Sequence, residues 1–208
     1  RGDAPTEHAR ILQKTRNLLD SRQMDAFKYE QESNQTRDRY GDSGFGRGCL
    51  MARRLVEVGV PFVEVNFGGW DNHQDIFNTL RNDKLPRLDQ AMSALVEDLS
   101  TRGMLEDTVI IWMGEFGRTP RINGNGGRDH WAKSWSAVVG GGCFHGGRVI
   151  GETNKDGTAV VGEAFSSQDL MASVCHALEI NLETTFTSRS GRPMKIANSG
   201  KLIEPLFA

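Results

Sequence analysis

Three short segments of the chain carry most of the side chains that could do chemistry: Gly68–His73, Gly114–Arg118 and Gly127–Trp131. Together they supply five candidate metal ligands, which are Asp71, His73, Glu115, Asp129 and His130. Three carboxylates brought together repel one another unless a cation lies between them. A mixed set of Asp, Glu and His suits a divalent metal such as zinc or manganese. The alternative is a set of loop residues that form caps and surface ion pairs.

Arginines flank these acidic positions, at Arg118, Arg121 and Arg128. A guanidinium donates paired hydrogen bonds and is the preferred partner of a tetrahedral oxyanion. Acidic ligands, a metal and arginines together therefore suggest a phosphate or sulfate ester as the substrate. The alternative is that the arginines only balance the charge of the acids.

The elements that would position these segments are read from periodicity. Helices are expected within residues 6–35 and over 47–58 and 84–102, and another opens at the capping pattern Ser166–Asp169. Apolar strands are expected at 62–67, 109–113 and 136–140. The run at 109–113 is apolar on both faces, which predicts a central strand covered by helices on each side. This alternation predicts an α/β layer structure with a mainly parallel sheet. Ligands of such sheets bind beyond the carboxyl ends of the strands, where the first two segments lie.

Composition excludes several classes of protein. The chain of 208 residues carries 25 Lys and Arg against 27 Asp and Glu, so no basic excess exists to bind a nucleic acid. No apolar run is long enough to span a membrane, and no signal peptide is visible. The three cysteines are widely spaced, which excludes a disulfide framework and a zinc ribbon. The loop 123–127 is rich in glycine but lacks the strand-then-helix context of a dinucleotide site.

Four motifs in this order resemble the DUF1501 family: Gly48–Glu57, Gly68–His73, Gly114–Pro120 and Gly127–Trp131. The resemblance runs from about Tyr40 to the end of the chain. It implies a polar helical lead-in over 1–39 and the C-terminal domain of that family over 40–208. Because the family is grouped with the alkaline phosphatase-like superfamily, it further implies a three-layer α/β/α fold with a metal site at one edge of the sheet.

The same resemblance implies roles for individual residues. Asp71, His73 and His130 would hold one metal ion, and Glu115 and Asp129 would hold or orient a second, although Phe116 stands where such enzymes have a ligand. Arg118 and Arg128 would bind the oxyanion. The ions expected are zinc, manganese or calcium. The nucleophile is expected upstream, so no catalytic residue is assigned within these 208 residues.

The implied function is a metal-dependent hydrolase domain that acts on a phosphate or sulfate ester, small or polysaccharide, and is inactive without the upstream nucleophile. The alternative is a non-catalytic exported module for binding or assembly that kept the fold and lost the chemistry. By the same resemblance the expected location is periplasmic or exported. The sequence makes no prediction about the oligomeric state.

Overall fold

The chain forms two compact units in a computed structural model that describes residues 6–19 and 21–208. Unit 1 comprises Arg1–Trp70 and Leu80–Thr101, and unit 2 comprises Asp71–Thr79 and Arg102–Ala208. Residues 1–5 and 20 of the predicted lead-in lie outside the described residues. The five candidate ligands all lie at Asp71 or later in the chain, and all five belong to unit 2.

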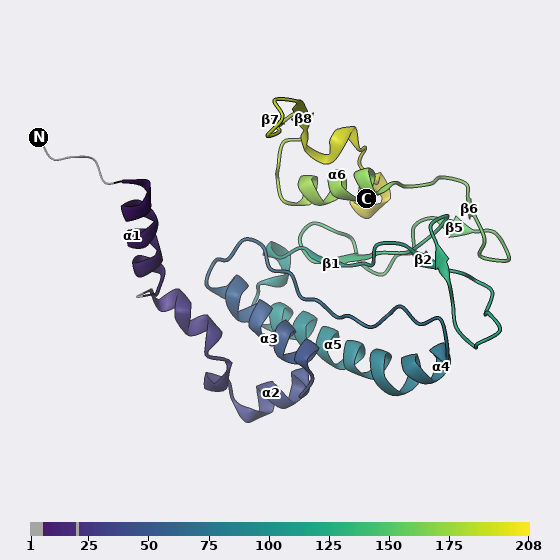
Figure 1. Cartoon of the computed structure of the whole chain (residues 1–208), viewed down its shortest axis with the longest axis horizontal. Helices are drawn as coiled ribbons and strands as arrows, with labels where there is room; N and C mark the ends of the chain where they lie inside the picture. The colour runs from purple at the N-terminus through teal and green to yellow at the C-terminus, as the bar shows by residue number, and fades with distance from the viewer. Residues whose placement is uncertain (1–5, 20) are drawn as a thin grey trace, which may run out of the picture. The chain divides into compact units, whose positions relative to one another are not determined.

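Unit 1 is built from helices (Figure 1). Its α-helices are α1 (Glu7–Leu19), α2 (Asn34–Tyr40), α3 (Gly44–Glu57) and α5 (Leu85–Thr101), with the 3₁₀-helices η1 (Arg22–Phe27) and η2 (Tyr29–Gln31). The π-helical turn η3 (Leu80–Lys84) precedes α5. Pro86, near the start of α5, has no N–H to donate to a carbonyl of the preceding turn, which accounts for the widened turn there.

The predicted helices of unit 1 are confirmed with shifted ends. α3 begins three residues before the expected start because the Ser43 hydroxyl accepts a hydrogen bond from the Gly46 N–H at 2.9 Å. The described residues of the lead-in form four short helices, and the first of them, α1, has no buried residue.

The core of unit 1 lies where α3 and α5 pack side by side (Figure 1). Tyr40, Cys49, Leu50, Ala91 and Ala94 form its buried cluster. The two alanines are the α5 residues of the cluster, and their small side chains allow the two helices to approach closely.

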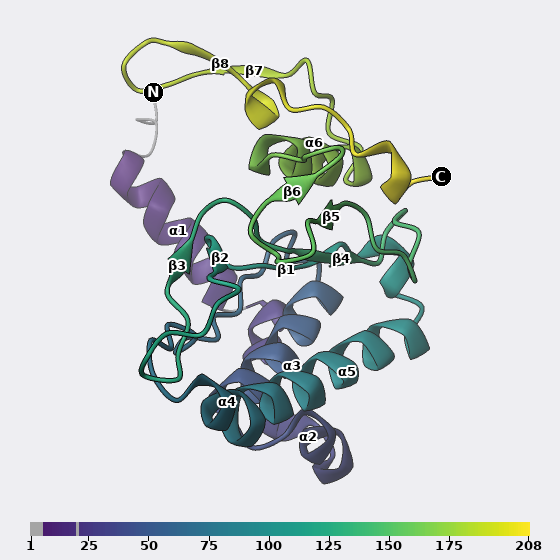
Figure 2. The same ribbon diagram turned by 90° about the vertical axis from the view of Figure 1, so that its right-hand side faces the viewer.

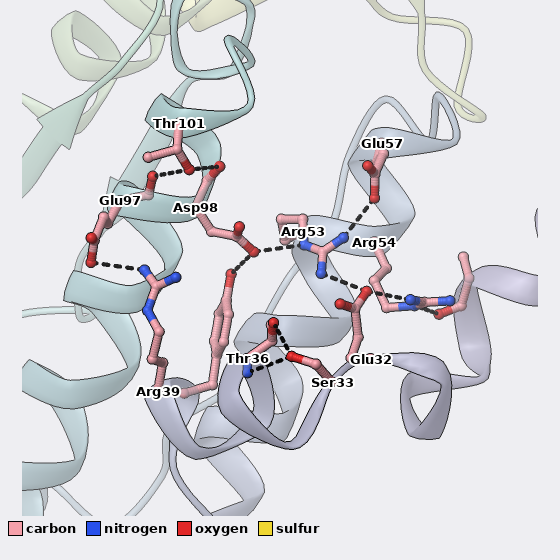
Figure 3. Close-up of polar contacts among 12 residues, drawn as sticks. Glu32, Ser33, Thr36, Arg39, Arg53, Arg54, Glu57, Glu97, Asp98 and Thr101 are labelled. Atoms are coloured by element: carbon pink, nitrogen blue, oxygen red, sulfur yellow. Dashed lines mark hydrogen bonds and ion pairs between the residues drawn. The ribbon is translucent and has the colours of Figure 1, made fainter.

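A network of charged side chains connects the helices of unit 1 (Figure 3). Arg53 is buried and forms ion pairs with Glu32 at 2.6 Å, Glu57 at 2.6 Å and Asp98 at 3.0 Å. The Tyr40 hydroxyl donates a hydrogen bond to Asp98 at 3.0 Å. Because buried charges are tolerated only when they are paired, the network ties α2, α3, α5 and the chain before α2 into one arrangement.

Unit 2 contains short strands in antiparallel pairs (Figure 2). The pairs are β1 (Ile110–Trp112) with β4 (Val138–Gly140), β2 (Gly117–Arg118) with β3 (His130–Trp131), β5 (Glu152–Thr153) with β6 (Val160–Val161), and β7 (Thr185–Thr187) with β8 (Pro193–Lys195). Its helices are α4 (Ile76–Thr79), α6 (Ser167–Ala177) and the 3₁₀-helices η4 (Leu105–Asp107), η5 (Ile196–Ser199) and η6 (Glu204–Leu206).

Helix α6 provides the buried residues around which the end of the chain folds. Ser166 and Asp169 form the predicted capping box at its start. Ala172, Ser173, Val174 and Cys175 are buried, and the Ser173 hydroxyl accepts a hydrogen bond from the Ile203 N–H at 2.9 Å.

The prediction of a three-layer α/β/α fold with a mainly parallel sheet is wrong for this structure. Among the described residues every sheet has two strands, and both strands run antiparallel. Residues 62–67 are not assigned as a strand, although their exposure alternates as a strand's would. β1, expected to be buried on both faces, has exposed residues at Ile111 and Trp112. A segment rich in β-branched and aromatic residues suits the pleated surface of a sheet. It becomes a strand only where a neighbouring strand pairs with it, and its own composition does not determine that.

Two further sequence expectations concern the cysteines and membranes. All three cysteines are free, and Cys143 is exposed while Cys49 and Cys175 are buried. In the part of the chain that the structure describes, no helix combines the length and the apolar character that crossing a bilayer requires.

Candidate metal centre

Loops and one strand pair of unit 2 bring the candidate ligands together. β2 and β3 pair so that Arg118 lies opposite His130. An isolated bridge between Gln74 and Gly126 joins the Asp71–His73 loop to the glycine-rich loop before β3. Side chains that are 59 residues apart in the sequence, Asp71 and His130, therefore come within hydrogen-bond distance.

Asp71, His73 and His130 form the group that could hold an ion. Each offers one ligand atom, and these atoms all lie within 4.8 Å of one another. Asp71 Oδ1 is 3.0 Å from His73 Nε2 and 3.0 Å from His130 Nε2. All three side chains are exposed. Two imidazoles and one carboxylate are a ligand set that zinc accepts when its remaining positions stay open to water or substrate.

Arg118 lies against the same carboxylate oxygen. Its Nη1 donates to Asp71 Oδ1, and its guanidinium lies 5.4 Å over the ring of Phe116. The hydrogen bond from Arg118, followed by that from His130, lowers the pKa of Asp71 to about 2. The carboxylate is therefore ionised at any physiological pH, which is the form that binds a metal.

Asp129 does not belong to the three-residue group but lies behind His73. Its Oδ1 is 2.7 Å from His73 Nδ1 and accepts a hydrogen bond from Asn123 Nδ2 at 3.0 Å. The contact with Asp129 is the main cause that raises the pKa of His73, and hydrogen bonds from His73 and then Asn123 lower the pKa of Asp129. Metal-binding histidines commonly have such a carboxylate on the other ring nitrogen.

The structure places the other predicted residues differently. Glu115 is exposed in the bend between β1 and β2 and lies outside the three-residue group. The ring of Phe116 lies 4.6 Å from that of His130. Arg128 Nη1 donates to the carbonyls of Thr119 at 2.5 Å and Pro120 at 2.7 Å, so this arginine holds a loop. Of the two arginines predicted to bind the oxyanion, Arg118 is the one that contacts the group.

Asn123 was missed by sequence reasoning. Its Oδ1 accepts hydrogen bonds from the N–H groups of Asn125 at 2.9 Å and Gly127 at 3.0 Å. Its Nδ2 donates to the His73 carbonyl at 3.0 Å as well as to Asp129. The available signal was an asparagine at the start of a glycine-rich loop, where its side chain can bond to backbone two residues on.

Comparisons with known proteins give one result that bears on the family. No curated protein and no solved structure matches the chain. A family model described as "Protein of unknown function (DUF1501)" matches residues 1–207. The match includes the lead-in as well as the motifs after Tyr40, so the expectation of a C-terminal portion is not supported. The comparisons also give no support to the alkaline phosphatase-like grouping. The chain belongs to the DUF1501 family.

Proposed function

We propose that Asp71, His73 and His130 bind a divalent metal ion, zinc or manganese, and that this centre serves the hydrolysis of a phosphate or sulfate ester. The observation that carries the proposal is the convergence of three ligand atoms within 4.8 Å of one another. The donor chemistry fits, because one ligand is a carboxylate whose pKa is about 2 and two are imidazoles. A bound ion would displace the proton through which His130 Nε2 donates to Asp71. A bound ion would polarise the ester and stabilise the charge that develops on it.

Arg118 is the residue of this chain that we expect to orient the substrate. One of its nitrogens donates to Asp71, and a guanidinium carries five N–H donors in a planar fork. The remaining donors suit two oxygens of a tetrahedral phosphate or sulfate group. Arg118 therefore couples the carboxylate ligand to the anion that would be cleaved.

A second candidate function is a binding or assembly module without chemistry. Two contacts favour it. The aromatic ring of Phe116 lies against His130, and the family resemblance implies a ligand of a second metal at this point of the sequence. Arg128 donates to the loop carbonyls of Thr119 and Pro120. A centre with one ion and one arginine can hold an anion without cleaving it.

Calorimetric titration with zinc and with manganese tests the proposed centre. We expect about one tightly bound ion per chain, lost in His130→Ala and retained in the control His8→Ala, which removes an exposed imidazole from α1. Turnover of p-nitrophenyl phosphate or p-nitrophenyl sulfate that His130→Ala abolishes would establish the hydrolase. Metal binding without turnover favours the module only in a protein that also supplies the nucleophile expected upstream, and no metal binding by the wild type overturns the proposal.

A further inference from the structure

We infer that Asp129, held in place by Asn123, is a positioning residue that fixes the His73 imidazole with Nε2 toward the metal and thereby sets the affinity of the centre. The inference rests on the proposed metal site. It adds to that site two residues that bind no ion themselves, and it assigns the glycine-rich loop the task of holding them.

The first step of the argument concerns the two nitrogens of His73. Nδ1 lies 2.7 Å from Asp129 Oδ1, and Nε2 lies 3.0 Å from Asp71 Oδ1. A neutral imidazole carries its proton on only one of these nitrogens, and the other nitrogen keeps the lone pair that a metal needs. With the proton on Nδ1, the lone pair points to Asp71 and His130. With the proton on Nε2, His73 cannot bind an ion in the group.

The two carboxylates around His73 do not compete for that proton equally. Asp71 Oδ1 already accepts from Arg118 and lies 3.0 Å from His130 Nε2. Asp129 Oδ1 has the shorter contact with His73 and one further donor, Asn123. The hydrogen bond on the Nδ1 side is therefore favoured, which leaves Nε2 available. Partners of this kind on metal-bound histidines orient the ring and make it a better donor.

The second step concerns Asn123, which fixes Asp129 and His73 together. Its Nδ2 donates both to Asp129 Oδ1 and to the His73 carbonyl, each at 3.0 Å. Its Oδ1 is occupied by two backbone N–H groups of the loop, so the amide has one orientation. Asp129 is an exposed side chain, and without this clamp it would be free to rotate away from His73.

The backbone supports the same arrangement from two sides. The Thr119 N–H donates to the Asp129 carbonyl at 2.8 Å, and the Asp129 N–H donates to the Thr119 hydroxyl at 3.0 Å. Gly127 lies so close to His73 that an added Cβ would be 2.0 Å from the His73 carbonyl carbon. The backbone of the loop therefore packs directly against the backbone of His73.

The test measures zinc affinity and the His73 tautomer on the full chain. We expect Asp129→Ala to weaken zinc binding about 10- to 100-fold. Asp129→Asn, which keeps an acceptor oxygen, should lose less, and Asn123→Ala should lose about 10-fold. Asp156→Asn, which changes an exposed acid elsewhere in unit 2, serves as the control. Circular dichroism establishes that each variant is folded.

The tautomer separates this inference from the proposed metal site. Nitrogen-15 NMR of the metal-free protein at alkaline pH should show His73 with its proton on Nδ1 in the wild type and a shift toward Nε2 in Asp129→Ala. A wild type that binds no zinc would refute the metal site, while the tautomer would still decide the role of Asp129. Wild-type affinity and an unchanged tautomer in Asp129→Ala overturn the inference. Complete loss of zinc from Asp129→Asn also overturns it, because Asp129 would then be a ligand.

Discussion

Replacing Arg53 with methionine removes the charge at the centre of the unit 1 network and keeps an unbranched side chain. The Arg53 side chain is 1% exposed and pairs with three carboxylates. The three carboxylates do not lose the same stabilisation when Arg53 is removed. Glu57, which is 40% exposed, can be solvated by water, and Glu32 retains its contact with Arg54. Asp98, which is 7% exposed, loses its buried cation.

The expected cost therefore comes mainly from one buried carboxylate. Removing one partner of a buried ion pair costs about 3–5 kcal/mol, because the other charge stays buried without compensation. Asp98 retains the hydrogen bond from Tyr40, and the other two acids have alternatives. We therefore expect Arg53→Met to lower the free energy of unfolding by about 3 kcal/mol, at the lower end of that range.

Urea denaturation followed by circular dichroism measures this loss. The matched control is Arg47→Met, whose partner Asp42 is fully exposed, and its expected loss is below about 1 kcal/mol. Adding Asp98→Asn to Arg53→Met removes the uncompensated charge, and this double variant should regain about 1 kcal/mol or more. A loss in Arg53→Met no larger than in Arg47→Met, with no recovery in the double variant, would refute the reasoning.

Three further predictions follow from single contacts. Burial raises the pKa of Glu32, but hydrogen bonds from two arginines outweigh it and hold the pKa below its ordinary 4.5. The unfolded chain therefore binds more protons there, so the free energy of unfolding should fall as the pH drops below about 4.5, and Glu32→Gln should flatten this slope in urea titrations. Ser166→Ala removes the hydroxyl that caps α6 and should cost about 1 kcal/mol in thermal unfolding. Gly127→Ala would bring a Cβ to 2.0 Å from the His73 carbonyl carbon, so zinc titration should show lost binding, while Gly124→Ala, which meets nothing within 4 Å, should bind as the wild type does.

The helices could be predicted from the sequence because their signals are local. The apolar repeat over 84–102 and the capping pattern at Ser166 lie within the elements that they specify, and α5 and α6 formed there. The strands could not be predicted as well, because a strand exists only with a partner. The apolar run at 109–113 favours a central strand of a parallel sheet, but β1 pairs with β4 in antiparallel register.

The candidate site shows the same division. The residue types indicated a metal site among five residues, the family resemblance pointed to Asp71, His73 and His130 for one ion, and the structure brings these three together. The distinction between a ligand and the residue behind it depends on loop conformation, so Asp129 could not be separated from the ligands by sequence. Asn123 acts through its own loop backbone, and a single sequence does not show which asparagine of a glycine-rich loop makes such bonds.

The measurement that tests the central claim most directly is X-ray absorption at the zinc edge on the zinc-loaded full chain. The account predicts a first shell of nitrogen and oxygen at about 2.0–2.2 Å, with the outer-shell signature of two imidazoles and no sulfur. The imidazole signature should disappear in a variant that lacks both His73 and His130. A shell containing sulfur, as zinc bound at the exposed Cys143 would give, or a protein that retains no zinc, would contradict the account.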